Sequence, residues 1–249
     1  MLAIFKREFK SYFTTPIGYI VLAAYFFFLG MFFHSSYSYG AADIAGCITG
    51  TYLVAVFILP VLTMRLMSED RRQKVDQVLL TAPVKVGSIV LGKYLAAMAV
   101  YVLAFAPTVI FEIIFATLIE VNVLTYLYAL LGAMLFGGVL IAIGMLFSAL
   151  TESPAIAAML SLLANVAVMF MEIFASYITV PTGAEGFFEK LWAGFLGFVV
   201  ALLEKMSLVN VFNGFASNVF SVTDVVYLAS LIFVFVFLSV RTLEKRRWS

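Results

Sequence analysis

The sequence predicts an all-α polytopic membrane protein with six transmembrane helices, and three observations carry that prediction. The 249 residues are 64% hydrophobic and 12% charged, whereas soluble domains are about 45–50% apolar and about 25% charged. Six apolar runs come close to or exceed the ~20 residues that a helix needs to cross a bilayer. The basic residues are confined almost entirely to three segments. This composition excludes a water-soluble globular enzyme and a disordered chain.

The chain is interpreted as one transmembrane domain, residues 1–249, that opens with a helix lying along the membrane surface. In residues 2–13, aromatic residues that include Phe5 and Phe9 recur at helical spacing between basic residues that include Arg7. This pattern is typical of an interfacial amphipathic helix. Pro16 is tolerated at the start of the helix that follows. A frayed basic tail is the alternative, and the aromatic periodicity disfavours it.

Six spans are expected after this surface helix, and a shorter apolar run lies between the last two. The expected spans are residues 17–33, 44–67, 90–119, 123–150, 154–180 and 225–240. The first run is too long and too aromatic for a cleaved signal peptide. The apolar run 191–203 is too short to cross, so residues 184–218 are expected to form an outer re-entrant or interfacial region.

The basic residues predict the orientation in the membrane. Thirteen of the 15 Lys and Arg residues lie near the N-terminus, within residues 65–93 or near the C-terminus. Cytoplasmic loops carry the excess of Lys and Arg in membrane proteins. All three segments are therefore placed in the cytoplasm. Because both termini then lie on the same side, the number of spans must be even. The membrane is expected to be the inner or plasma membrane. A net charge of +1 gives no support to nucleic-acid binding.

The longest cytoplasmic segment is expected to hold a short amphipathic helix, residues 69–83. Val75, Val78 and Leu79 form an apolar stripe among charged residues, and Pro83 ends the helix. A helix of this kind suits insertion into a groove of a partner protein. A helix lying flat on the membrane surface is the alternative.

No arrangement of residues predicts catalysis or metal binding. One Cys and one His leave neither a thiolate metal cluster nor a catalytic triad. Residues 87–93 match the spacing of a phosphate loop, but Tyr94 replaces the Ser or Thr that would hold Mg²⁺, and no strand precedes the match. The chain is therefore not expected to be an enzyme or to bind a cofactor directly. Any ATP and Mg²⁺ would be bound by another chain.

Four polar residues within the expected spans are candidates for a pathway or an outer gate. Glu112 follows Lys93, and Glu172 follows Ser153, by helical segments of equal length. At ~1.5 Å per residue, these segments place both carboxylates roughly 29 Å from the cytoplasmic end, near the outer interface. The other two candidates are one helical turn apart, at Ser161 and Asn165. The alternatives are interfacial carboxylates and an interhelical hydrogen bond.

Three segments jointly resemble the six-span permease subunits of ABC-2-type ABC transporters. The closest branch contains the gliding-motility and nitrous-oxide-reductase-maturation permeases. The matching residues are Phe5-Lys6-Arg7-Glu8-Phe9 with Thr15-Pro16-Ile17-Gly18-Tyr19, Glu69 with Leu79-Leu80-Thr81-Ala82-Pro83-Val84 and Leu91-Gly92-Lys93, and Leu243-Glu244-Lys245-Arg246-Arg247-Trp248. The resemblance implies that residues 2–13 are an elbow helix and that 69–83 is a coupling helix. The implied ATPase contacts are Glu69, Arg72, Val75, Val78, Leu79, Leu80, Pro83 and, in a second coupling turn, Glu152.

One departure from the resemblance lies inside the expected coupling helix. Many relatives carry Gly-Thr where this chain has Lys74-Val75. Because Lys and Val are both compatible with a helix, the helix is expected to continue through this point.

The resemblance implies a permease subunit of an ATP-driven transporter, with export favoured. The implied partners are cytosolic ABC ATPase subunits, a second copy or a related permease, the lipid bilayer and an extracytoplasmic accessory subunit. Two alternatives stay open. One is a secondary transporter or channel that works without ATP, and the other is a membrane anchor that transmits force within a larger complex.

Overall fold

The computed structural model describes residues 1–40, 43–75, 85–117, 122–178, 192–198, 200, 207–216 and 221–247. Within these residues the regular structure is helical, with no strand. The helices are α1 (Leu2–Thr14), α2 (Pro16–Ser38), α3 (Ile44–Gly50), α4 (Tyr52–Thr63), α5 (Ser68–Arg72), α7 (Val86–Ala104), α8 (Ala106–Ala116), α9 (Val123–Leu150), α10 (Pro154–Tyr177), α12 (Leu208–Ala216) and α13 (Val222–Arg247).

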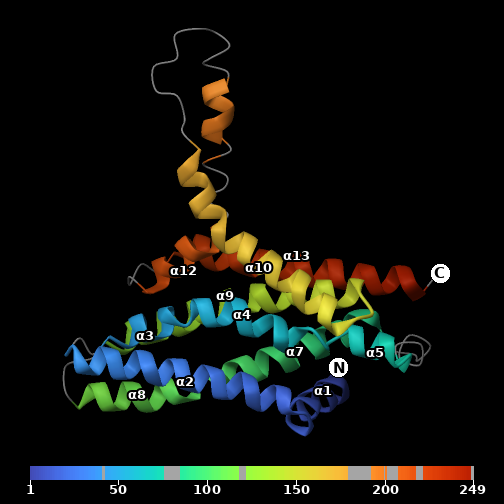
Figure 1. The fold of residues 1–249 in the computed structure, drawn as a ribbon, viewed down its shortest axis with the longest axis horizontal. Coiled ribbons are helices and arrows are strands. Elements are labelled where there is room, and N and C mark those ends of the chain that lie inside the picture. Colours follow the sequence, from blue (N-terminus) through green and yellow to red (C-terminus); the bar gives the residue numbers. More distant parts are fainter. Residues whose placement is uncertain are drawn as a thin grey trace.

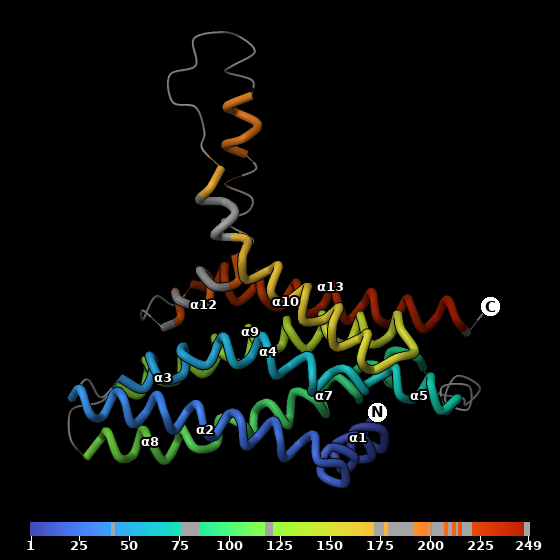
Figure 2. Tube along the Cα trace, viewed as in Figure 1, coloured from blue at the N-terminus to red at the C-terminus, as the bar shows by residue number. Residues whose placement is uncertain are grey.

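Six helical stretches of the described chain are long and apolar enough to cross a membrane. They are Pro16–Ser38, Tyr52–Arg72, Val86–Ala116, Val123–Leu150, Pro154–Met171 and Val222–Arg246. The prediction of an all-helical, multi-pass membrane protein is therefore confirmed at this level. Figure 2 shows most of these stretches running lengthwise through one bundle.

Two of the spans are interrupted. The second, Tyr52–Arg72, is divided into α4 and α5 by the turn of residues 64–67, and α3 precedes it across a break at Thr51. The third is divided into α7 and α8 at Phe105. Pro107 lies in the first turn of α8, where its missing N–H costs no helical hydrogen bond. The proline therefore fits a helix that restarts after the break.

α9 is the centre of the bundle and packs against α3, α4, α7, α10, α12 and α13. Its glycines allow this close packing, because a Cβ at Gly137 would overlap the Tyr101 ring. A Cβ at Gly144 would likewise overlap Thr63 Oγ1. Small residues spaced four apart commonly permit such close helix approach in membranes.

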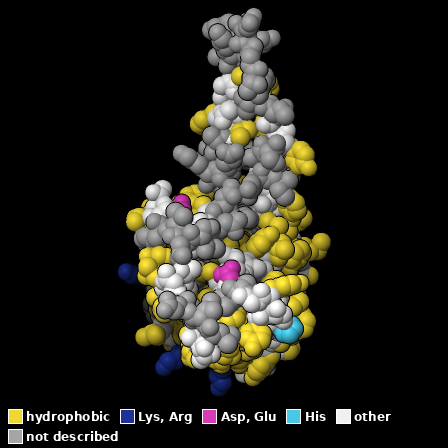
Figure 3. Space-filling model, turned by 90° about the vertical axis from the view of Figure 1, so that its left-hand side faces the viewer, with side chains coloured by type: hydrophobic (Ala, Val, Ile, Leu, Met, Phe, Trp, Pro, Cys, Tyr) yellow, Lys and Arg dark blue, Asp and Glu magenta, His cyan; other side chains and the backbone are white. Residues whose placement is uncertain are grey.

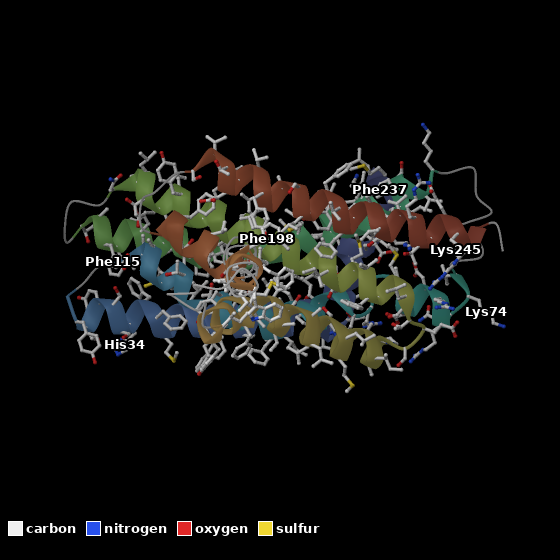
Figure 4. All side chains as sticks on the ribbon, turned by 90° about the horizontal axis from the view of Figure 1, so that it is seen from above. His34, Lys74, Phe115, Phe198, Phe237 and Lys245 are labelled. Carbon is white, nitrogen blue, oxygen red and sulfur yellow. The ribbon has the colours of Figure 1, made fainter. Side chains whose placement is uncertain are left out.

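The two ends of the bundle differ in charge. Both termini and α5 lie at one end, and α1 is set crosswise to the bundle there (Figure 1). Lys74 and Lys245 mark the same end in Figure 4, whereas His34 and Phe115 lie at the opposite end. In Figure 3, which faces the end that carries His34, Lys and Arg side chains are visible only at the rim. We refer to the end with the termini as the basic end.

The expected outer region, residues 184–218, is described only at 192–198, 200 and 207–216. Residues 192–198 are helical and, with the far half of α10, stand away from the bundle (Figure 1). α12 instead packs on α9, where the Phe136 and Phe212 rings stack with centroids 5.0 Å apart. The re-entrant assignment stays a prediction.

Candidate functional site

The centre of the basic end is a buried lysine. Lys93 on α7 is 1% exposed. Its Nζ lies 3.0 Å from Glu8 Oε1 of α1, 2.7 Å from Asp70 Oδ2 of α5 and 2.6 Å from the Leu66 carbonyl oxygen. An ammonium group has three donors, so these contacts satisfy it fully. Burial of a charge is tolerated when it is paired in this way.

Arg7 completes a cluster that we call the four-charge cluster: Arg7, Glu8, Asp70 and Lys93. Arg7 Nη2 lies 2.5 Å from Glu8 Oε1 and 3.6 Å from Asp70 Oδ2. Burial lowers the pKa of Arg7, but the hydrogen bond and charge of Glu8 and the charge of Asp70 outweigh burial and raise the pKa overall. The cluster therefore holds two cations and two anions that link three helices.

Close backbone packing brings α1 within reach of this cluster. A Cβ at Gly92 would lie 3.2 Å from both Ile4 Cβ and the Met1 carbonyl oxygen. The hydroxyl of the buried Tyr12 donates a hydrogen bond to the Leu62 carbonyl oxygen at 3.0 Å. Burial raises the pKa of Tyr12, so its phenol stays protonated as this donor requires. α1 is thus anchored at two points along its length.

A second ion pair holds Glu69 beside the four-charge cluster. Arg65 forms a two-pronged ion pair with the Glu69 carboxylate, and Gln73 Nε2 donates to Glu69 Oε1 at 3.1 Å. A polar pocket of about 340 Å³ lies between these residues and the cluster. Val75, the last described residue before 76–84, also lines this pocket. The pocket therefore opens where the expected coupling segment begins.

The turn between α9 and α10 is tied to α5 by a different set of contacts. Ser148 Oγ accepts hydrogen bonds from Met67 N at 3.0 Å and Ser68 N at 3.1 Å. Arg71 Nη2 lies 2.5 Å from Glu152 Oε1, and Arg71 Nη1 donates to the Leu150 carbonyl oxygen at 3.3 Å.

The C-terminal helix reaches the same turn. Arg246 of α13 donates a hydrogen bond to the Ala149 carbonyl oxygen. Helices α5, α9 and α13 are therefore connected at the basic end.

The structure brings together part of the set that the sequence predicted for partner contact. Glu69 and Glu152 take part in the ion pairs above, Arg72 is exposed beside them, and Val75 lines the pocket. Phe5 and Phe9 stack with ring centroids 5.8 Å apart. Four predicted residues lie outside the described residues: Val78, Leu79, Leu80 and Pro83.

The roles of Lys93 and Arg71 are not among the sequence predictions. Lys93 enters those predictions only through the phosphate-loop match, the family resemblance and the depth of Glu112. A lysine followed by an apolar run does signal a buried charge that needs a partner. Which carboxylates serve it depends on how α1 and α5 pack, and no sequence pattern contains that information.

Two of the pathway candidates on α10, Ser161 and Asn165, are buried but lack hydrogen-bond partners among the described residues. Ser161 is 0% exposed and Asn165 is 1% exposed. Ser161 Oγ and both amide atoms of Asn165 make no hydrogen bond with the described residues. A Cβ at Gly144 would lie 2.9 Å from Ser161 Oγ, which places this hydroxyl against α9. An interhelical hydrogen bond is the alternative to a pathway role for Ser161 and Asn165. Within the described chain, the two residues form no such bond.

Glu112 on α8, at the end of the bundle opposite the basic end, is a third buried polar residue. It is 8% exposed, and neither carboxylate oxygen has a partner in the described part of the chain. The side chain of Glu172 lies outside the described residues. Buried polar groups within a membrane are costly and commonly functional.

The fold and site define a multi-pass helical membrane protein whose basic end joins α1, α5, α7, α9 and α13 through buried or partly buried polar contacts. No protein-family model matches the chain, and no curated protein shows significant similarity to it.

Proposed function

We propose that the chain is the permease subunit of an ATP-driven, ABC-2-type transporter with its basic end in the cytoplasm. The observation that carries the proposal is the connected basic end. The segments implied as ATPase contacts, around Glu69 and Glu152, belong to a set of ion pairs and hydrogen bonds that reaches α1, α7, α9 and α13. A cytosolic ATPase docked at α5 would therefore act on a linked set of helices.

The contacts suggest how a displacement of α5 would spread. Asp70 would carry it to α7 through Lys93, and Glu8 would carry it on to α1. Arg71 would carry it to the α9–α10 turn through Glu152. Coupling between distant sites can be carried by networks of ion pairs and packed side chains, and the short ion pairs between these helices form such a network. ATP and Mg²⁺ would be bound by the ATPase, and this chain would carry out no chemistry.

The polar pair on α10 supports a pathway that is closed in this arrangement. Ser161 and Asn165 face the bundle interior without partners among the described residues. α10 is much less buried in the bundle than α9, with 17% of its apolar stretch buried against 67% for α9. A movement of α10 would expose the pair to a pathway shared with a second copy or a related permease. Export is the favoured direction.

The decisive experiment is purification of the tagged chain from its native membranes. We expect it to retain a cytosolic ATPase that carries a phosphate loop, together with any extracytoplasmic accessory subunit. Leu79→Asp should leave the complex assembled but uncouple ATP hydrolysis from transport. Gln77→Asp adds the same charge outside the predicted apolar stripe and should preserve coupling. A Leu79→Asp complex with unchanged coupling would refute the coupling assignment.

An ATP-independent transporter is the second candidate, and the observation that favours it is the carboxylate of Glu112, which has no partner among the described residues. Ion-coupled transporters use carboxylates within the membrane. This candidate predicts solute flux by the purified chain in liposomes without any ATPase, and loss of that flux in Glu112→Gln. A force-transmitting anchor would instead assemble with its partners and move no solute.

A further inference from the structure

A groove with wholly apolar walls lies between α1 and the membrane-embedded part of α7. Its volume is about 660 Å³, within the ~300–1,000 Å³ range of small-molecule sites. α1 contributes Phe5 and Phe9, and α7 contributes Leu95, Met98, Ala99 and Val102. The α7 wall extends from Leu95 to Leu103, roughly 12 Å at ~1.5 Å per residue. An apolar groove of this length suits a linear hydrocarbon chain.

The groove lies on the outer surface of the bundle. Leu95 is 38% exposed and Val102 is 49% exposed, so the wall faces the surroundings of the bundle and not its core. α7 belongs to a stretch that is apolar enough to span a membrane. In a bilayer this surface meets acyl chains, which are the apolar molecules available there at high concentration.

Two exposed lysines flank the groove at its α1 side. Lys6 lies one helical turn from both Leu2 and Phe9, which line the groove, and Lys10 lies one turn further along α1. The Lys6 and Lys10 side chains form no ion pair with any described residue. Arg7, by contrast, is occupied by Glu8 and Asp70. The two lysines are therefore available to an anionic group at the membrane surface.

We propose that this groove is a binding site for one anionic phospholipid, with an acyl chain along α7 and the head group at Lys6 and Lys10. The fit has two independent parts, the apolar walls and the adjacent positive charge. Lysines near a membrane surface attract anionic lipids. A bound lipid would fill the space beside the contact of Gly92 with Ile4 and so brace α1 against α7. The site needs only a membrane around the bundle, so it does not depend on the proposed ATPase.

Native mass spectrometry of the full chain, released from micelles doped with equal amounts of phosphatidylglycerol and phosphatidylcholine with the same acyl chains, tests the site. We expect one lipid molecule to be retained per chain, and we expect it to be phosphatidylglycerol more often than phosphatidylcholine. Val102→Trp should fill the groove and lower retention severalfold, because the acyl chain loses its van der Waals contacts with the groove walls. The matched control is Val234→Trp on α13, at a position of similar exposure (47%) outside the groove. It should retain lipid like the unmodified chain.

A second pair of measurements separates the head group from the chain. Lys6→Gln with Lys10→Gln should abolish the preference for phosphatidylglycerol but keep a bound lipid. A photoreactive acyl chain should crosslink to residues 95–103 in preference to α13. Equal retention by the two tryptophan variants, crosslinking spread evenly over all spans, or a preference that survives loss of both lysines would overturn the proposal.

Discussion

Arg71 of α5 and Glu152 of the α9–α10 turn form an ion pair, with 2.5 Å between Nη2 and Oε1, although two other spans separate them in the sequence. Each belongs to one of the two segments that the family resemblance implies as ATPase contacts. The pair therefore joins these segments directly, and Arg71 reinforces the link through the Leu150 carbonyl oxygen. A force applied to either segment would reach the other without passing through the bundle core.

Reversing the charges of this pair is the first prediction. Arg71→Glu and Glu152→Arg should each reduce ATPase coupling, and the double variant should restore most of it. Because Glu152 is 65% exposed, the pair should contribute only about 0.2–1 kcal/mol to stability. Unfolding in mixed micelles and ATPase assays of the four chains form a double-mutant cycle that checks both effects. If the double variant did not recover ATPase coupling, Arg71 and Glu152 would not link the two segments directly.

Lys93 should contribute far more to stability than Arg71. Lys93→Met removes the cation from between Glu8 and Asp70 and leaves two partly buried carboxylates facing each other. Breaking a buried ion pair by removing one partner costs about 3–5 kcal/mol, and the partial exposure of the two carboxylates favours the lower figure. The measurement is the free energy of unfolding in mixed micelles.

The exposed Lys85, at the start of α7, provides the matched control, and Lys85→Met should be nearly neutral. Adding Glu8→Gln and Asp70→Asn to Lys93→Met should recover part of the loss, because the two carboxylates, which would have only Arg7 as a cation, are then neutral and no longer repel each other. A Lys93→Met chain as stable as Lys85→Met would show that the four-charge cluster does not hold α1, α5 and α7 together.

Two glycines of α7 should respond differently to alanine. A Cβ at Gly87 would meet nothing within 4 Å, so Gly87→Ala should stabilise α7 by up to about 1 kcal/mol through helix propensity. A Cβ at Gly92 would press on α1 at 3.2 Å, so Gly92→Ala should gain less and Gly92→Leu should displace α1. Limited proteolysis after the basic residues of α1 reports the displacement. Equal protection of α1 in all variants would contradict the close packing.

The structure interrupts the expected coupling helix at the position where the sequence departs from the family resemblance. α5 ends at Arg72, and Lys74 has a φ of 58°. The expectation that the helix continues through Lys74 is wrong at this residue. The left-handed region costs an L-residue roughly 1–2 kcal/mol and costs glycine nothing, although glycine loses more chain entropy on folding. A glycine, which many of the permeases that the sequence resembles carry at this position, would therefore suit this backbone better than lysine does.

Lys74→Gly should raise the free energy of unfolding by a few tenths to about 1 kcal/mol, the difference between these two effects. Gln73→Gly, one residue earlier at a φ of −88°, should lower stability because it adds the entropy cost, relieves no strain and removes the hydrogen bond to Glu69. Chemical denaturation of both variants in the same micelles provides the comparison. A loss of stability in Lys74→Gly equal to that in Gln73→Gly would show that residue 74 is not left-handed in the membrane.

The features that could be predicted well from the sequence are those that the bilayer imposes. Hydrocarbon thickness sets a length for every span, so the six apolar stretches are visible without any knowledge of packing. The partners of Lys93 could not be predicted, because Glu8 and Asp70 come from two other helices and meet it only when α1 crosses α7. The left-handed Lys74 could not be predicted either, because residue propensities treat lysine as a helix former.

Replacing Asn165 with an apolar residue should raise stability and reduce transport. Its two amide atoms are buried and have no partner among the described residues, so they lower stability in this arrangement. Asn165→Leu keeps a similar volume and should raise the free energy of unfolding by about 1–2 kcal/mol. If Asn165 lines a pathway when α10 moves, the same variant should reduce transport and substrate-stimulated ATP hydrolysis. Leu160→Met, a volume-conserving change on the same helix, should alter neither quantity by much. A stabilised Asn165→Leu chain with full transport activity would assign the amide to packing alone.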